Sequence, residues 1–266
     1  DETGDPEPLA EALEPTDLLS GIAQTSSLPG ESTQVLSAGI DAAPLSIIIG
    51  QTQTVYDAVA SAIADSLRDG TKNAMVILQD GASYEVGGKG KDPTVIAFDN
   101  TMKNAVKEKL GPSYVSAIDF TGLNLSLVST GSNGGTSVSS GNAAKILNGL
   151  TVDAAGAKGV SLNLAGISAQ DAEGNDKTIV TKGVESISYL GTAGQDRVSL
   201  NATGAKRVVV ATGGGSGESV NLTVAGAGSK EDLSIQAATN GTVSVGLNAG
   251  SARNTSVTAS GNADLA

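Results

Sequence analysis

Two short segments of this sequence gather oxygen-bearing side chains that could bind a metal ion. The first is GTAGQDRV, Gly191–Val198, in which Asp196 follows two glycines. Glycine permits a tight turn, and a carboxylate together with backbone carbonyls supplies the hard oxygen ligands that Ca²⁺ prefers. The segment therefore predicts either a calcium site at Asp196 or an ordinary turn between two strands.

The second segment is DAEGND, at positions 171–176. Asp171, Glu173 and Asp176 could hold Ca²⁺, but the bidentate glutamate at position twelve of an EF-hand loop is missing. Gly174 and Asn175 are also common turn formers. The alternatives for this segment are again a calcium site and a turn.

Short alternating strands surround both segments. Val198 and Leu200 alternate with polar neighbours, as do Val208 and Val210. Strand centres recur about every eleven or twelve residues, with glycine-rich turns between them, as in a chain that repeats one small β-unit. GGSGESV, at 214–220, partly repeats the first segment, with Glu218 in place of the aspartate.

These residues carry a family resemblance, mainly over residues 184–224. GTAGQDRV is similar to the calcium-binding nonapeptide G-G-x-G-x-D-x-hydrophobic, with Thr192 replacing the second glycine. With the preceding VESISYL, it resembles bacterial S-layer proteins and RTX-like secreted repeat proteins. The resemblance implies export, display at the cell surface and bound Ca²⁺.

The composition limits the chemistry that this chain can perform. It has no His and no Cys, so it lacks the usual general base near neutral pH and any thiolate metal ligand. Only 2% of its residues are aromatic. A histidine-free lyase or hydrolase using Asp196 and Glu218 is the least favoured interpretation, and we expect no enzyme.

The charge of the chain limits its partners. The formal net charge is −12, and the first 67 residues carry eleven of the 28 carboxylates with no Lys or Arg. An acidic chain without a basic stripe is not expected to bind nucleic acid. No hydrophobic run reaches the roughly 18 residues of a membrane span, so membrane insertion is not expected either.

Shifts in composition predict three domains. Residues 1–44 form an acidic, proline-containing extended arm, which is either disordered or donates a strand to a neighbouring subunit. Residues 45–120 form an α+β domain, and residues 121–266 form a Gly-rich β-repeat domain. All seven prolines precede residue 113.

Periodicity places several elements within residues 45–120. LSIII (45–49) and TVIAF (94–98) predict strands, while MVIL (75–78) and SYEV (83–86) around Asp80–Gly81 predict a hairpin. A helix is expected after Thr54, and a second helix after Asp99, ending at Gly111. YVSAIDF (114–120) predicts a returning strand.

The expected fold class is mainly β with an α+β N-terminal domain. For the C-terminal body we favour a β-solenoid over an antiparallel β-sandwich, because Val, Leu, Ile and Ala suit a narrow interior, whereas a sandwich normally uses larger aromatics. The sequence thus predicts an extracellular or cell-surface structural protein whose partners are copies of itself in a filament or surface layer. The alternative is a monomeric adhesin that binds glycan or protein through loops of the β-repeat body.

Overall fold

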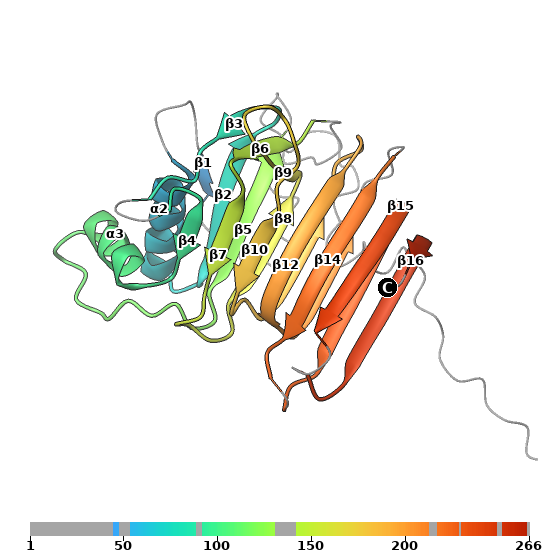
Figure 1. Cartoon of the computed structure of the whole chain (residues 1–266). Helices are drawn as coiled ribbons and strands as arrows, with labels where there is room; N and C mark the ends of the chain where they lie inside the picture. Colours follow the sequence, from blue (N-terminus) through green and yellow to red (C-terminus); the bar gives the residue numbers. More distant parts are fainter. Residues whose placement is uncertain are drawn as a thin grey trace, which may run out of the picture.

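The computed structural model describes residues 45–47, 54–88, 92–130, 142–212, 217–228, 230–248 and 252–264. The expected acidic arm at 1–44 lies outside these ranges. The described chain is mainly β and contains two helices at its N-terminal end (Figure 1). The mainly-β fold class is therefore confirmed.

Parallel strands are stacked along the molecule in three rows. The first row runs in the order β1 (Leu45–Ile47), β2 (Asn73–Gln79), β5 (Asn124–Thr130), β8 (Ser161–Ala165), β11 (Ser186–Leu190), β13 (Arg207–Ala211), the first part of β15 (Leu233–Asn248) and the first part of β16 (Thr255–Asp264).

The second row lies across from the first and is joined to it through β15. Its order is β4 (Val95–Ala97), β7 (Leu150–Asp153), β10 (Ile179–Lys182), β12 (Arg197–Ala205), β14 (Ser219–Gly226), then the second parts of β15 and β16. A third, shorter row contains β3 (Ser83–Tyr84), β6 (Ala144–Leu147) and β9 (Ile167–Gln170).

Every ladder between named strands is parallel, which is the pairing that a solenoid requires and an antiparallel sandwich does not have. The expected hairpin at 75–86 is wrong. β2 pairs with β1 and β5, and β3 pairs with β6, so the turn at Gly81 joins two different rows. Parallel neighbours are far apart in sequence, and a local turn signal does not identify them.

Apolar side chains are aligned from strand to strand along each row. In the first row the aligned buried positions are Leu125, Leu162, Ile187, Val208 and Ile235, and in the second row they are Leu150, Ile179, Leu200, Leu222 and Val245. Small and medium aliphatic side chains fill this interior, as the composition predicted.

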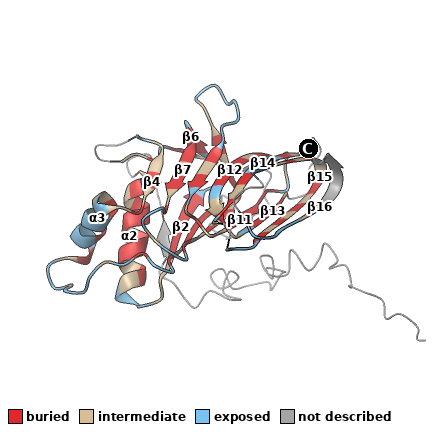
Figure 2. Ribbon diagram, turned by 60° about the horizontal axis from the view of Figure 1, so that its bottom comes forward, coloured by how far each residue is buried: buried red, intermediate tan, exposed pale blue. Residues whose placement is uncertain are grey.

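Helix α2 (Val55–Arg68) packs against β1 and β2 and is largely buried (Figure 2). Thr54 caps it by accepting a hydrogen bond from the backbone N–H of Asp57 at 3.2 Å, which confirms the expected helix start. The N–H groups of Val55 and Tyr56 donate to the carbonyls of Glu85 and Val86. These bonds fix α2 to the chain segment that follows β3.

Helix α3 (Asn100–Leu110) is amphipathic and was also predicted. Asp99 caps its N-terminus, Met102, Val106 and Leu110 are buried, and Gly111 follows its last residue. The strand expected at 114–120 is wrong: no residue of that segment is in a strand, and Val115 is 93% exposed. Its apolar residues do not alternate cleanly, and Phe120 alone is buried against Phe98.

The α+β region and the β-repeat region share one sheet and one core. The ladder between β2 and β5 runs from Asn73↔Asn124 to Gln79↔Thr130, and the same cluster of buried residues contains Val59, Leu127 and Val245. The helices thus lie at one end of the stacked strands, and β16 lies at the other.

Candidate functional site

The short third row forms the floor of a polar pocket. Along β6 and β9, Ile146 and Ala169 are buried toward the core, while Lys145, Ser168 and Gln170 alternate to the opposite face. Lys145 and Ser168 are paired residues on neighbouring strands. The alternation of AKIL and ISAQ therefore presents three polar side chains on one outer surface.

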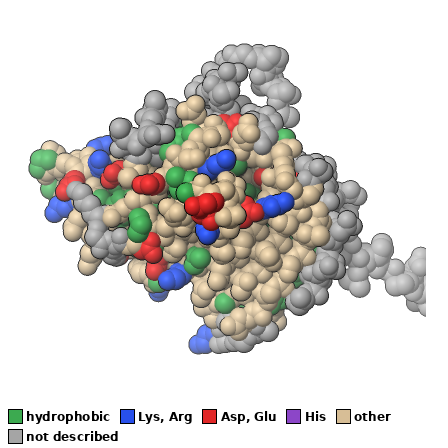
Figure 3. All heavy atoms as spheres, turned by 45° about the horizontal axis from the view of Figure 1, so that its top comes forward, with side chains coloured by type: hydrophobic (Ala, Val, Ile, Leu, Met, Phe, Trp, Pro, Cys, Tyr) green, Lys and Arg blue, Asp and Glu red, His purple; other side chains and the backbone are tan. Residues whose placement is uncertain are grey.

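The pocket has a volume of about 510 Å³ and brings together the two oxygen-rich segments of the sequence. Asp176 and Asp196 both line it, although they belong to different turns of the chain. Acidic and basic side chains gather side by side on this face of the molecule (Figure 3). The lining residues that carry charge or hydrogen-bonding side chains are Asn142, Lys145, Ser168, Gln170, Asn175, Asp176, Tyr189, Thr192, Gln195, Asp196 and Arg197.

Asp196 is only 5% exposed, and its own loop holds its carboxylate. Oδ2 accepts from the backbone N–H of Thr192 at 2.9 Å, and Oδ1 accepts from the Thr192 hydroxyl at 3.1 Å. A Cβ atom at Gly191 would overlap this carboxylate, so a larger residue there would displace Asp196 from its hydrogen bonds with Thr192. The glycine-containing motif therefore builds a compact turn around a buried acid.

The carboxylates of the second segment have different neighbours. Asp171 accepts from Asn175 and from the Lys177 ammonium at 3.0 Å, and these interactions lower the pKa of Asp171 to about 2. Asp176 lies 3.9 Å from Arg197, and Glu173 is exposed. Within the ranges that the structure describes, no three acidic side chains are grouped closely enough to hold a metal ion.

Three pocket residues were not singled out from the sequence. Lys145 and Gln170 have no polar side-chain partner among the described residues, and the buried hydroxyl of Ser168 has no hydrogen-bond partner there. Arg197, at the start of β12, contributes a fourth donor group to the lining. The signal that could have found the first three is the polar–apolar alternation of two short segments that pair with each other.

Tyr189 lies beneath the pocket and links it to the interior. Its hydroxyl donates to the carbonyl of Ile167 at 2.8 Å, which fixes β11 against β9. Burial raises the pKa of Tyr189, and the nearby carboxylates of Asp196 and Asp176 raise it further. Its hydroxyl thus remains protonated and serves as a structural donor.

Glu218 occupies the position of Asp196 one turn further along, as the partial repeat of the motif predicted. Arg197 pairs with Ser219, and the Ser219 N–H donates to the Asp196 carbonyl. Glu218 is 2% exposed and accepts from the hydroxyls of Thr212 and Thr239. We call Thr192, Asp196, Thr212, Glu218 and Thr239 the buried corner.

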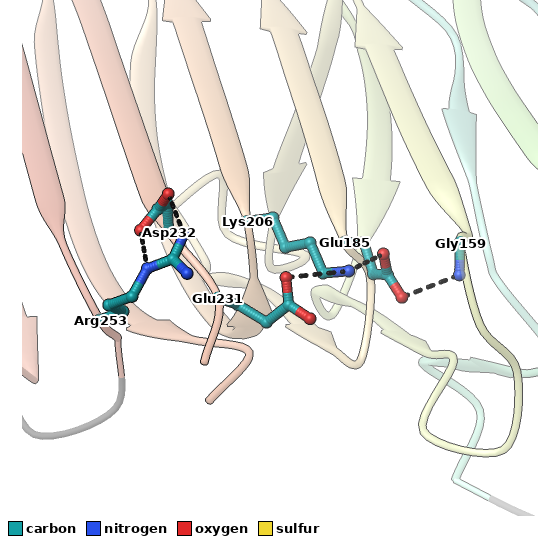
Figure 4. A network of polar contacts seen from close by, with 6 residues as sticks. All are labelled: Gly159, Glu185, Lys206, Glu231, Asp232 and Arg253. Carbon is teal, nitrogen blue, oxygen red and sulfur yellow. Dashed lines mark hydrogen bonds and ion pairs between the residues drawn. The ribbon is translucent and has the colours of Figure 1, made fainter. Parts of the chain in front are cut away.

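An exposed corner lies at the opposite junction of the two main rows (Figure 4). Glu185 accepts from the Gly159 N–H at 2.9 Å and pairs with Lys206 at 2.8 Å, and Lys206 also approaches Glu231 at 3.5 Å. The Lys206 hydrogen bond is the main cause that lowers the pKa of Glu185. Asp232 and Arg253 form a separate pair at 2.6 Å.

Comparison with family models, with curated proteins and with solved structures gave no match to this chain. Among the described helices, neither has the length and apolar character needed to span a bilayer. The features of the described residues that indicate a function are therefore the polar pocket and the edge of the stacked strands.

Proposed function

We propose that this chain is a non-enzymatic β-solenoid subunit that assembles with copies of itself into an extracellular filament or surface layer. The observation that carries this proposal is the edge of β16. Among the described strands β16 pairs with β15 alone, so the backbone groups on its other side face no described strand. An unpaired parallel edge is a template for pairing with another chain.

The side chains of β16 favour the same conclusion. Val257 continues the aligned row of Val208 and Ile235, yet it is only partly buried because no further described strand covers it. Pairing with a second copy would bury this side chain and extend the row. The helical end of the stack is different, because α2 covers the core there.

The outer face of the second row supports close packing between copies. In β12 and β14 and the second part of β15, most of the outward positions after Arg197 are short, uncharged and polar, in rows such as Ser199–Asn221–Ser244 and Asn201–Thr223. A flat surface with few charges imposes little electrostatic repulsion on a neighbouring copy. The surface-layer proposal therefore uses the edge of β16 for pairing and this face for lateral contact.

A single charge on β16 tests the proposal. Negative-stain electron microscopy and light scattering of the purified chain should show filaments or sheets. Val257→Lys should abolish them, because it places an ammonium in the aligned apolar row at the edge. Val115→Lys, the same substitution at a valine that is 93% exposed and lies outside the described strands, should leave assembly intact. Circular dichroism of both variants should match that of the unchanged protein.

The same experiment distinguishes the alternatives. Dispersed single particles at every concentration would overturn self-assembly and leave the monomeric adhesin, for which the polar pocket is the supporting observation. Assembly that requires millimolar Ca²⁺ and is lost in Asp196→Asn would assign the ion to the Gly191–Val198 loop. Assembly that occurs equally with and without Ca²⁺ would show that assembly does not need calcium.

A further inference from the structure

We infer that the pocket on the outer face of β6 and β9 binds an acidic saccharide, with a uronate residue as the recognised unit. This inference deepens the adhesin alternative and is independent of self-assembly. It rests on three features: an unusual set of hydrogen-bond donors on the pocket floor, the balance of charge in its walls, and its size.

The floor presents donors that no described residue satisfies. Ser168 is the strongest of them, because its hydroxyl is buried and lacks a partner, and such a group costs free energy unless a ligand or water completes it. Lys145 lies beside Ser168 on the paired strand, and Gln170 lies two residues further along β9 on the same face. An ammonium, a hydroxyl and a carboxamide are thus carried on one face at the backbone spacing of a β-sheet, about 4.8 Å between neighbouring strands and about 6.7 Å between alternate residues of one strand.

The charges of the walls favour a carboxylate-bearing ligand. Asp196 is held by Thr192, and Asp176 is 3.9 Å from Arg197, at the outer limit of an ion pair. Lys145 has no ion pair among the described residues. Arg197 and Lys145 are therefore the groups in the pocket with the most remaining capacity to bind, and both bind carboxylates through charge-assisted hydrogen bonds.

The remaining lining suits sugar hydroxyls. Gln195 donates its amide N–H to the Gly217 carbonyl at 2.8 Å, which orients its side chain, and the Asn175 amide donates to Asp171 at 3.0 Å. Oriented amides of this kind accept and donate hydrogen bonds to hydroxyl groups. The volume of about 510 Å³ lies within the range of small-molecule sites, and its mainly polar lining favours a polar ligand.

The test measures the binding of uronate trisaccharides by titration calorimetry, using trimers of galacturonate, glucuronate and mannuronate. It is performed on the Val257→Lys variant, so that assembly cannot contribute. At least one trimer should bind, and its methyl ester, which keeps the hydroxyls and removes the charge, should bind about tenfold more weakly. Lys145→Gln and Arg197→Gln should each cause a similar loss. Lys182→Gln, an equal charge change at an exposed position outside the pocket, should cause none.

Ser168→Ala separates a binding role from a structural one. Because the Ser168 hydroxyl has no partner in the free protein, its removal should leave the melting temperature unchanged or raise it, while lowering the affinity several-fold. Failure of all three acids to bind at millimolar concentration would overturn the inference. Two other results would also overturn the inference, because each would show that the pocket does not recognise a uronate. The first is equal binding of the acid and its methyl ester, and the second is displacement of the trimer by equimolar inorganic phosphate.

Discussion

The two corners of the β-repeat body have the same structural role, but one is buried in the protein and the other is exposed to water. Each corner must hold successive turns of the chain in register where the backbone leaves one row of strands and enters the other. The buried corner uses carboxylates that accept hydrogen bonds from threonine hydroxyls, with Asp196 and Glu218 only 5% and 2% exposed. The exposed corner uses ion pairs between Glu185, Lys206 and Glu231.

The difference between the corners is energetic. A buried donor or acceptor that loses its hydrogen-bond partner carries the full free-energy cost of desolvation. The groups of an exposed ion pair can instead form contacts with water when the pair is broken. The buried corner should therefore determine the global stability of the repeat body. The exposed corner should affect local opening and the response to pH. Substitutions matched across the two corners test this division.

The largest effect is expected at Gly241, which holds the position equivalent to Asp196 and Glu218 in the next turn. A Cβ atom there would lie 2.6 Å from the Glu218 carbonyl carbon and still closer to its oxygen, so two backbones would have to separate. Gly241→Ala should lower the free energy of unfolding by about 3 kcal/mol. Urea denaturation followed by circular dichroism measures the loss.

Gly246→Ala is the matched control for that experiment. It lies on the same strand, and its Cβ would meet only the Leu222 carbonyl at 3.7 Å and the Thr223 hydroxyl at 3.9 Å, which are ordinary contacts. Its stability should be unchanged or slightly higher, because alanine restricts the unfolded chain. Equal losses in both variants would mean that strand propensity, and not the close approach at the buried corner, limits stability.

The second effect concerns the carboxylate of Glu218. Glu218→Ala leaves the hydroxyls of Thr212 and Thr239 without their shared acceptor and should cost about 2 kcal/mol. Glu218→Gln retains one acceptor oxygen and should cost less. The midpoint of urea unfolding for the three proteins should therefore decrease in the order Glu, Gln, Ala. A Gln variant as unstable as the Ala variant would show that the negative charge, and not the acceptor, is what the corner requires.

The buried corner also shows how much of this structure was predictable from the sequence. The equivalence of Asp196 and Glu218 followed from a partial motif repeat, and both helices followed from caps and four-residue periodicity. The pocket could not be predicted from the sequence, because it combines Lys145 with Asp176 and Arg197 from separate turns of the chain. The hairpin at 75–86 failed for a related reason: Asp80–Gly81 favours a turn, but Asn73 pairs with Asn124, and such distant pairing leaves no local mark.

The stability that the exposed corner contributes should depend on pH. Glu185→Gln should cost about 0.5 kcal/mol at pH 7. The pKa of Glu185 is lowered from 4.5 in the folded chain, so the stability that it contributes is present above pH 4.5 and is lost as the pH falls through the lower, folded value. The difference in melting temperature between the two proteins should therefore shrink from pH 7 toward pH 3. A difference that stays constant with pH would show that the ionised carboxylate of Glu185 contributes nothing, because its bonds to Lys206 and to the Gly159 N–H both favour the ionised form.

The smallest effect is expected at Arg253, where the exposed corner reaches the last described strand. Arg253 donates from Nε and a terminal nitrogen to the two oxygens of Asp232, at 2.9 and 2.6 Å, yet both side chains are more than half exposed. The backbone bond from the Arg253 N–H to the Glu231 carbonyl does not depend on the side chain. Arg253→Gln should therefore leave the global melting temperature unchanged, because solvent-exposed pairs contribute little to stability. Hydrogen exchange in β16 should become several-fold faster, because such a pair can restrain a terminal strand. A fall in the global melting temperature as large as that of Glu218→Ala would contradict the division between the two corners, since it would show that an exposed pair holds the whole stack together.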